Sequence, residues 1–229
     1  MSKILALDTS TDACSVALYI DGKTREDFRI IPRQHTKQLL PMIQAMLDSA
    51  SLKVSDLDSI AFGRGPGSFA GIRIATGVAQ GLAFASELQL LPVSTLASMA
   101  YARYLSHGDK YIVAALDARM DEIYWAAYSV EEGQLVLQGS ERVDAPSNLE
   151  LPEGHSWVGI GSGWSYAETM SDSVQRCVTV VDAQAYPHAE HIAQLGAVDF
   201  AKGLAVDPEL ALPVYLRDDV AWKKKDQQK

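Results

Sequence analysis

The sequence predicts an α/β protein in which two halves repeat one plan of strands and helices. In the first half, an apolar strand over residues 4–8 ends in Asp8, and two further strands, a helix and alternating strands and helices follow. After residue 110 the pattern restarts with an apolar strand that ends in Asp117. Such a repeat of strand-rich and helical segments indicates a duplicated α/β architecture.

Turn signals and periodicity define the first half. Strands over residues 14–20 and 23–30 flank Asp21-Gly22, a dipeptide typical of a two-residue hairpin turn. The elements that follow are a helix over 35–49, a strand over 58–62, a helix over 70–85, a strand over 90–93 and a helix from Ser94 or Thr95 to about 105. Pro41 interrupts the first helical pattern and should make that helix start late or kink.

The second half has shorter elements. We expect strands over 111–117, 122–130 and 134–138, a polar loop over 141–156, a strand over 157–160, a helix near Trp164, a strand over 177–181 and a helix over 187–202. These elements suggest an N-terminal domain over residues 1–106 and a smaller C-terminal domain over 107–229, whose last segment can pack back on the first domain.

Composition narrows the class of protein. The net charge of −9 argues against independent tight binding to nucleic acid, because such binding rests on Lys and Arg neutralising phosphates. Two cysteines, Cys14 and Cys177, make no disulfide framework, and no apolar stretch is long enough to span a bilayer. With no secretory leader at the start of the sequence, we expect a cytoplasmic protein.

The C-terminal segment has a local excess of basic residues. It contains Arg217, Lys223, Lys224, Lys225 and Lys229, with Trp222 among them. A solvated tail is one interpretation. An auxiliary contact to RNA or to an acidic partner is the other, and whether Lys223–Lys225 touch tRNA stays open.

The run Gly63-Arg64-Gly65-Pro66-Gly67-Ser68-Phe69-Ala70-Gly71-Ile72-Arg73 is the most informative stretch. It ends a strand and opens a helix, so its backbone amides lie at the positive end of the helix dipole, where an anion can bind. It is not a P-loop, because no Gly-Lys-Ser/Thr follows. A tight turn alone would also use the glycines.

Several motifs together resemble the TsaB (YeaZ) family. They are Asp8-Thr9-Ser10 after an apolar strand, Pro-Arg-Gln-His-Thr at 32–36, the glycine-rich run at 63–73, Leu116–Met120 and Pro213–Arg217. The likeness extends from Ile4 to about Lys225. The order of elements is that of the ribonuclease-H-like half of actin, sugar kinases and Hsp70. The resemblance therefore implies an actin-like, ribonuclease-H-like (ASKHA) duplicated fold whose second half is reduced.

The resemblance also implies a function. TsaB is the non-catalytic partner of TsaD in bacterial tRNA threonylcarbamoyladenosine (t6A) biosynthesis. As such a scaffold or activating subunit, the chain would support threonylcarbamoyl transfer to N6 of adenosine 37 in ANN-decoding tRNAs. Its partners would be TsaD in a heterodimer, the ATPase TsaE docked on that pair, and a second copy of itself when TsaD is absent. Contact with tRNA would come only through the complex, and none with a membrane is expected.

The resemblance places a vestigial nucleotide site in this chain. The corresponding residues are Asp8, Thr9, Ser10, Gly65, Gly67, Ser68, Asp117, Gly161 and Gly163. A carboxylate at residue 8 could position a magnesium-bound water, or it could simply bond to backbone at the strand end. We expect no required cofactor, and weak binding of ATP and magnesium at most.

We expect neither a metal site nor catalytic residues. TsaD carries a His-x-x-x-His pair after its glycine loop and helix, whereas residues 91–99 here contain no histidine. His188 and His191 are spaced i, i+3 near the start of a predicted helix, and we interpret them as residues of a solvent-facing helix terminus and not as metal ligands. The alternative functions are a stand-alone actin-like ATPase or kinase and, as a minor possibility, a peptidase. No His-Glu-x-x-His or Gly-x-Ser-x-Gly motif supports the last.

Two helices of the first half suggest a subunit interface. Gly77 and Gly81 lie four residues apart, and each costs about 1 kcal/mol relative to alanine in a helix interior. Close approach of another backbone would explain that cost, although packing on the chain's own sheet is the alternative. The predicted contact residues are Leu39, Met42, Ile43, Met46, Ile74, Gly77, Val78 and Gly81. We expect the folded monomer to tolerate changes at the methionines better than changes at the glycines.

Overall fold

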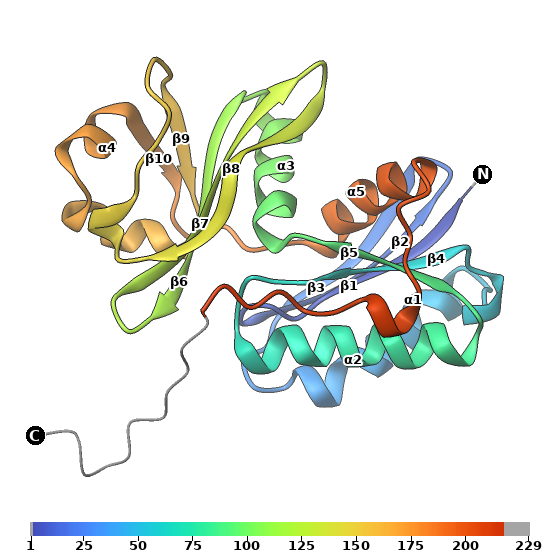
Figure 1. The fold of residues 1–229 in the computed structure, drawn as a ribbon. Coiled ribbons are helices and arrows are strands. Elements are labelled where there is room, and N and C mark those ends of the chain that lie inside the picture. Colours follow the sequence, from blue (N-terminus) through green and yellow to red (C-terminus); the bar gives the residue numbers. More distant parts are fainter. Residues whose placement is uncertain (1, 218–229) are drawn as a thin grey trace, which may run out of the picture.

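The structure, a computed structural model, describes residues 2–217 and contains two five-stranded sheets with helices on their faces (Figure 1). The first sheet comprises β1 (Lys3–Asp8), β2 (Ala13–Ile20), β3 (Lys23–Ile30), β4 (Ser59–Gly63) and β5 (Gln89–Val93). The second comprises β6 (Tyr111–Arg119), β7 (Glu122–Glu131), β8 (Gln134–Asp144), β9 (Trp157–Ile160) and β10 (Val178–Asp182). The α-helices are α1 (His35–Ser49), α2 (Phe69–Ala85), α3 (Thr95–His107), α4 (Asp172–Cys177) and α5 (Ala189–Ala201).

Both sheets have the same topology. The first runs β3-β2-β1-β4-β5, and the second, read in the same direction, runs β8-β7-β6-β9-β10. In each sheet the first three strands form an antiparallel meander and the last two add in parallel. Asp8 ends the central strand of the first sheet, and Asp117 lies at the corresponding end of the second. The predicted duplicated, actin-like fold is confirmed.

The second half is reduced in its helices and not in its strands. Where the first half has the fifteen-residue α1 between its third and fourth strands, the second has only a short 3-10 helix, Pro146–Asn148. Where the first half has the seventeen-residue α2, the second has a 3-10 helix over Ser162–Thr169 and the six-residue α4. The second sheet therefore has less helical cover on this face.

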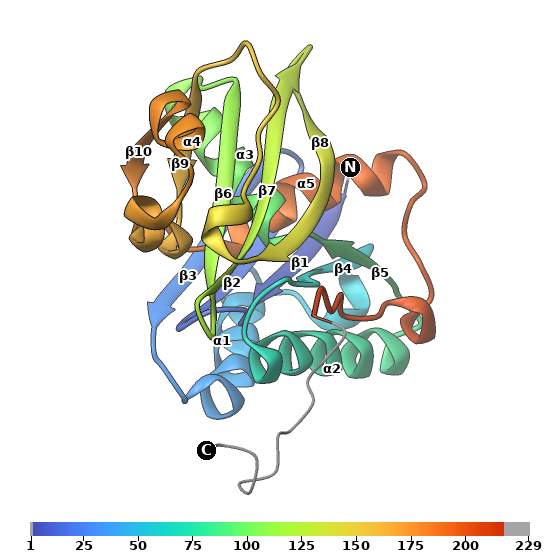
Figure 2. The ribbon, with the colours of Figure 1, turned by 60° about the vertical axis from the view of Figure 1, so that its left-hand side comes forward.

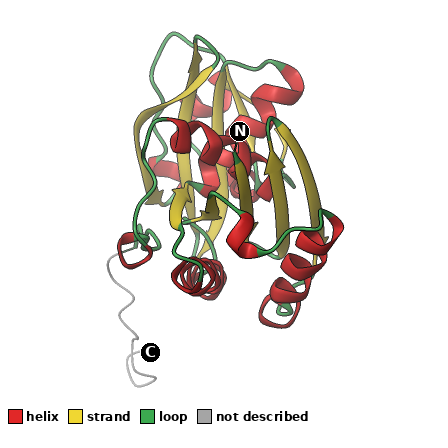
Figure 3. Ribbon diagram, turned by 90° about the vertical axis from the view of Figure 1, so that its right-hand side faces the viewer, coloured by secondary structure: helices red, strands yellow, loops and turns green. Residues whose placement is uncertain are grey.

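The last helix of each half packs on the sheet of the other half. Helix α3 covers β6 and β7, whereas α5 covers all five strands of the first sheet (Figures 1 and 2). Helices α1 and α2 lie on the opposite face of the first sheet, so helices cover both of its faces (Figure 3). The boundary between residues 106 and 107 stays a prediction, but the exchange of α3 and α5 shows that the halves interlock.

Burial on both faces explains the apolar composition of the central strands. In β1, Leu5 and Leu7 pack with α1 and α2, while Ile4 and Ala6 pack with α5. Side chains alternate between the two faces of a strand, so a strand covered on both sides reads as a continuous apolar run. The sequence signal for β1 is strong for this reason.

In three places the structure adds to or corrects the local expectations. Strand β8 continues to Asp144, so residues 141–144, expected as loop, pair with β7. Helix α1 begins at His35 and includes Pro41 at its seventh position, so of the two expected effects of Pro41 the late start is wrong, while the kink stays a prediction. The helix expected near Trp164 is present as a 3-10 helix over Ser162–Thr169. Helix α4 was not predicted, because its six residues are too few to show a period.

Residues 206–217, here called the C-terminal strap, run from the first half toward the second. Val206 pairs with Leu90 beside β5 through hydrogen bonds of 2.8 and 2.9 Å. The side-chain amide of Gln80 on α2 donates to two strap carbonyls, and the strap ends against the β6–β7 turn (Figure 1). Within the described residues, no helix combines the length and apolar character needed to cross a membrane. The basic residues Lys223–Lys225 lie outside the described residues.

Candidate cleft and helix face

A cleft of about 710 Å³ lies between the two halves. Both walls contain residues that the sequence singled out, since Ser10, Gly67 and Ser68 line it from the first half. Asp117 lines it from the second half, beside Ser162. The remaining predicted nucleotide-site residues, Asp8, Thr9, Gly65, Gly161 and Gly163, do not line it.

Asp8 is buried beneath the strand end and does not reach the cleft. Its Oδ1 accepts hydrogen bonds from the amide and the hydroxyl of Ser10 at 2.8 and 2.7 Å, while its buried Oδ2 has no partner among the described residues. Burial raises the pKa of this carboxyl to about 6, and the Ser10 hydrogen bonds oppose the rise. A Cβ on Gly63 would lie 1.8 Å from Oδ2, so glycine is needed there to admit the carboxylate.

Thr9 and Ser10 bind the first turn of α2. The Thr9 hydroxyl donates to the carbonyl of Gly71 at 2.6 Å, and a Cβ on Gly71 would lie 1.9 Å from the Thr9 carbonyl oxygen. The amide of Ser68 donates to the carbonyl of Ser10 at 2.7 Å. A Cβ on Gly67 would lie 2.5 Å from the same Ser10 oxygen. These contacts let β1 and α2 approach closely. They also engage the Ser68 amide, which a bound anion would otherwise use.

The glycines at 161 and 163 serve the packing of the second half. A Cβ on Gly161 would lie 2.2 Å from the carbonyl oxygen of Ala115, and Gly161 has a φ of +96° that favours glycine. A Cβ on Gly163 would lie 2.7 Å from the Ala115 Cβ. Their small size therefore has a reason within the chain that needs no nucleotide.

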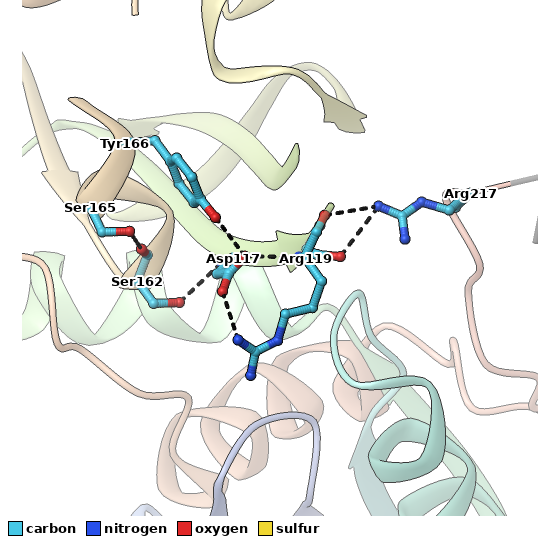
Figure 4. Close-up of polar contacts among 7 residues, drawn as sticks. Asp117, Arg119, Ser162, Ser165, Tyr166 and Arg217 are labelled. Atoms are coloured by element: carbon cyan, nitrogen blue, oxygen red, sulfur yellow. Dashed lines mark hydrogen bonds and ion pairs between the residues drawn. The ribbon is translucent and has the colours of Figure 1, made fainter. Parts of the chain in front are cut away.

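Asp117 lies at the centre of a polar cluster on the second wall (Figure 4). Its carboxylate accepts from the Arg119 amide at 2.8 Å and pairs with the Arg119 guanidinium at 3.3 Å. The Asp117 amide donates to the Ser162 hydroxyl at 3.0 Å, and Tyr166 lies 3.5 Å from the carboxylate. Arg217 reaches the backbone of Ala118 and Arg119 from the strap, as Figure 4 shows. These neighbours thus fix the position of Asp117 in the wall of the cleft.

The cationic side chains that line the cleft are arginines. The described residues that line it include no lysine and no histidine, and its cations are Arg119 and Arg217. Ser68 caps α2, and its hydroxyl accepts from the Gly71 amide. In the described part of the chain, no group of three or more His, Cys, Asp or Glu residues could hold a metal ion. His188 instead pairs with Glu26 at 2.7 Å and stacks on Phe28.

The predicted interface divides between core and surface. Leu39, Met42, Ile43 and Met46 of α1 belong to the core beneath the first sheet, and Met42 is 1% exposed. The structure thus corrects their assignment to the surface, because the apolar stripe of α1 faces the chain's own sheet. A Cβ added at Gly77 or Gly81 would have no atom of another described residue within 4 Å, outside the backbone of its own helix. The buried methionines and the open space at the two glycines argue against the expectation that the monomer tolerates changes at the methionines better than at the glycines.

An exposed face of α2 remains. It contains Ile74, Gly77, Val78, Gly81 and Phe84, of which the two glycines and Phe84 are exposed and the other two half-buried. Phe84 is 78% exposed, and among the large apolar side chains of the described residues only Met120, at 81%, is more exposed. Sequence reasoning missed Phe84, although its i, i+3 spacing from Gly81 could have indicated it. Leu40, on α1, is also exposed.

Comparisons with known proteins agree with this architecture. Residues 29–225 match a family model described as "TsaD: tRNA N6-adenosine threonylcarbamoyltransferase". The chain is 40% identical to the tRNA threonylcarbamoyladenosine biosynthesis protein TsaB of Escherichia coli, over 97% of both chains. It is 37% identical to the Haemophilus influenzae protein of the same name, over 96% of both. The solved structure of YeaZ from Pseudomonas aeruginosa has a TM-score of 0.88 and 46% identity, covering 94% of this chain and 100% of that one. These similarities span almost the whole sequence, and the chain therefore belongs to the TsaB (YeaZ) family of tRNA threonylcarbamoyladenosine biosynthesis proteins.

Proposed function

We propose that this chain is a non-catalytic subunit that pairs with TsaD through the exposed face of α2. In that role it supports threonylcarbamoyl transfer to N6 of adenosine 37 in ANN-decoding tRNAs, and tRNA meets it only within the complex. TsaE docks on the pair, and a second copy of the chain covers the same face when TsaD is absent. A cytoplasmic location, where tRNA is modified, belongs to the same proposal.

The two open glycines of α2 carry this proposal. Each costs about 1 kcal/mol relative to alanine in a helix, and no atom of residues 2–217 lies close enough to either Cβ position to require glycine. They lie on one helix face with Phe84, which is largely exposed. A surface with an aromatic anchor and glycines that permit close backbone approach fits a helical partner.

The same geometry favours a scaffold over a stand-alone ATPase, kinase or peptidase. An ATPase would need free amides and a cation at the glycine loop, but the Ser68 amide already donates to Ser10. A peptidase would need a base beside Ser68, and the described residues lining the cleft provide no histidine. We therefore expect purified chain without TsaD to form no threonylcarbamoylated product and to cleave no peptide.

Binding of TsaD by surface variants tests the proposal. Gly81→Leu adds a bulky side chain where the free chain has space, so it should leave folding intact and reduce association by about 2 kcal/mol or more. Phe84→Ser should also weaken binding. Ala201→Leu, an exposed change on α5, is the matched control. Calorimetric titration with purified TsaD measures the affinities, and circular dichroism confirms folding. Wild-type affinity in both folded α2 variants would place the interface elsewhere.

A further inference from the structure

A partly buried ion pair joins the two halves. The Nη2 atom of Arg64 lies 3.0 Å from the Oε2 atom of Glu141, and the two side chains are 25% and 7% exposed. Arg64 follows β4 in the glycine-rich run, whereas Glu141 lies on β8 of the second sheet. Water screens such a shielded pair poorly, and removing one partner would leave a buried charge uncompensated.

The second oxygen of Glu141 is also engaged. Its Oε1 accepts hydrogen bonds from the hydroxyl of Ser94 and from that of Tyr128, the latter at 3.5 Å. Ser94 caps α3, the helix that crosses to the second sheet, through a bond of 3.1 Å from the Ala97 amide. One carboxylate thus connects the glycine loop, the start of α3 and strand β7.

The backbone of Arg64 is held equally firmly. Its amide donates to the carbonyl of Val93 at 2.8 Å, and its carbonyl accepts from the amide of Val214 in the C-terminal strap at 2.8 Å. Three residues further on, Arg217 forms an ion pair with Glu122 and donates to the carbonyl of Ala118 at 3.3 Å. The strap thus continues from Arg64 to the β6–β7 turn of the second half.

We propose that the Arg64–Glu141 pair and the Arg217 end of the strap lock the two halves at one angle, so that the chain is a rigid body and not a clamp that closes on a ligand. Two-domain proteins that close do so through a few hinge residues. Here the Arg64–Glu141 pair and the Arg217 end of the strap each connect the two halves. The last helix of each half, α3 or α5, also packs on the sheet of the other half. The α2 face and the second half then reach any partner in one fixed relative orientation.

Distances between spin labels on the two halves test the lock. We choose Ala45→Cys on α1 and Ser156→Cys before β9, both exposed, in a Cys177→Ser background that leaves only the buried Cys14. Pulsed electron paramagnetic resonance on the folded chain should give one narrow distance distribution, unchanged by ATP with magnesium. Glu141→Gln and Arg217→Gln should each broaden it. Arg29→Gln, which breaks an exposed pair with Asp27 inside β3, should not.

Two further results complete the test. The double variant Arg64→Glu/Glu141→Arg restores an ion pair with the charges exchanged. Its distance distribution should be narrower than that of the Arg64→Glu or the Glu141→Arg single variant. Arg217 lies on the surface strap, so its variant stays informative if Glu141→Gln impairs folding. A distribution as narrow as that of the unmodified chain in Arg217→Gln and in folded Glu141→Gln would overturn the proposal. A shift of the unmodified chain on adding ATP and magnesium would overturn it too.

Discussion

The carbonyl oxygen of Ser10 accepts a 2.7 Å hydrogen bond from the amide of Ser68, the residue that caps α2. This bond joins the end of β1 to the glycine loop at the place where the dipole of α2 favours an anion. Gly67 is required beside it, because a Cβ there would lie 2.5 Å from the Ser10 oxygen. The loop thus uses its glycine for contact with the chain's own backbone.

We predict weak binding of ATP by the isolated chain. A phosphate at the loop would have to displace the Ser10 carbonyl from the Ser68 amide, and no lysine lines the described part of the cleft to compensate. Isothermal titration with ATP and magnesium should give a dissociation constant no tighter than the micromolar range. If weak binding occurs in the cleft, Arg119→Ala should reduce it further. A nanomolar constant would contradict the prediction.

The contribution of Asp8 to the stability of the chain should fall as the pH rises through its titration range. Burial raises the pKa of this carboxyl from 3.8 to about 6, so between these values the folded state binds more protons than the unfolded state. The penalty is absent below the lower value and complete above the upper one. It amounts to about 3 kcal/mol at most, because each pKa unit corresponds to about 1.4 kcal/mol.

Asp8→Asn isolates this effect. The variant keeps an oxygen to accept from Ser10 but cannot ionise, so its stability relative to the unmodified chain should increase with pH across that window. Urea unfolding between about pH 4.5 and pH 7.5 measures the difference. Asp48→Asn, at an exposed aspartate on α1, is the control. Parallel stability curves for Asp8→Asn and the unmodified chain would exclude this role for Asp8.

The glycines of α2 should separate into two classes. Gly77→Ala and Gly81→Ala should each stabilise the isolated chain by about 1 kcal/mol, since an added methyl group meets nothing within 4 Å. Gly71→Ala should destabilise it by about 1–3 kcal/mol, because its Cβ would overlap the Thr9 carbonyl. Thermal melting under identical conditions compares the three. Similar melting shifts for all three would show that the local space does not decide the outcome.

The methionines of α1 should be essential for folding and not specifically for association. A carboxylate in place of Met42 would be buried without a partner in the core beneath the first sheet, which costs several kcal/mol. We expect Met42→Glu to lose native circular dichroism and cooperative melting. Ala45→Glu, at an exposed position of the same helix, should retain both. A native, cooperative Met42→Glu variant would show that this stripe is not core.

Local patterns in the sequence were sufficient to predict most elements and the duplicated topology. Apolar runs buried on both faces, the Asp21-Gly22 turn and the glycine-rich run each depend on short-range chemistry that a sequence displays directly. Strand β8 was predicted too short because residues 139–142 are glycine or polar, and their strand conformation depends on pairing with β7.

The candidate sites depended more on tertiary structure. An amphipathic stripe shows that α1 has a buried side, but it cannot show whether the chain's own sheet or a partner covers it, because both bury the same apolar surface. In the same way, a glycine required by close packing, such as Gly71, and one facing open space, such as Gly77, look identical in the sequence. The motifs and their order were therefore determined by the sequence itself. Only the folded structure decided which residues serve packing and which remain exposed, because that depends on contacts between residues far apart in the chain.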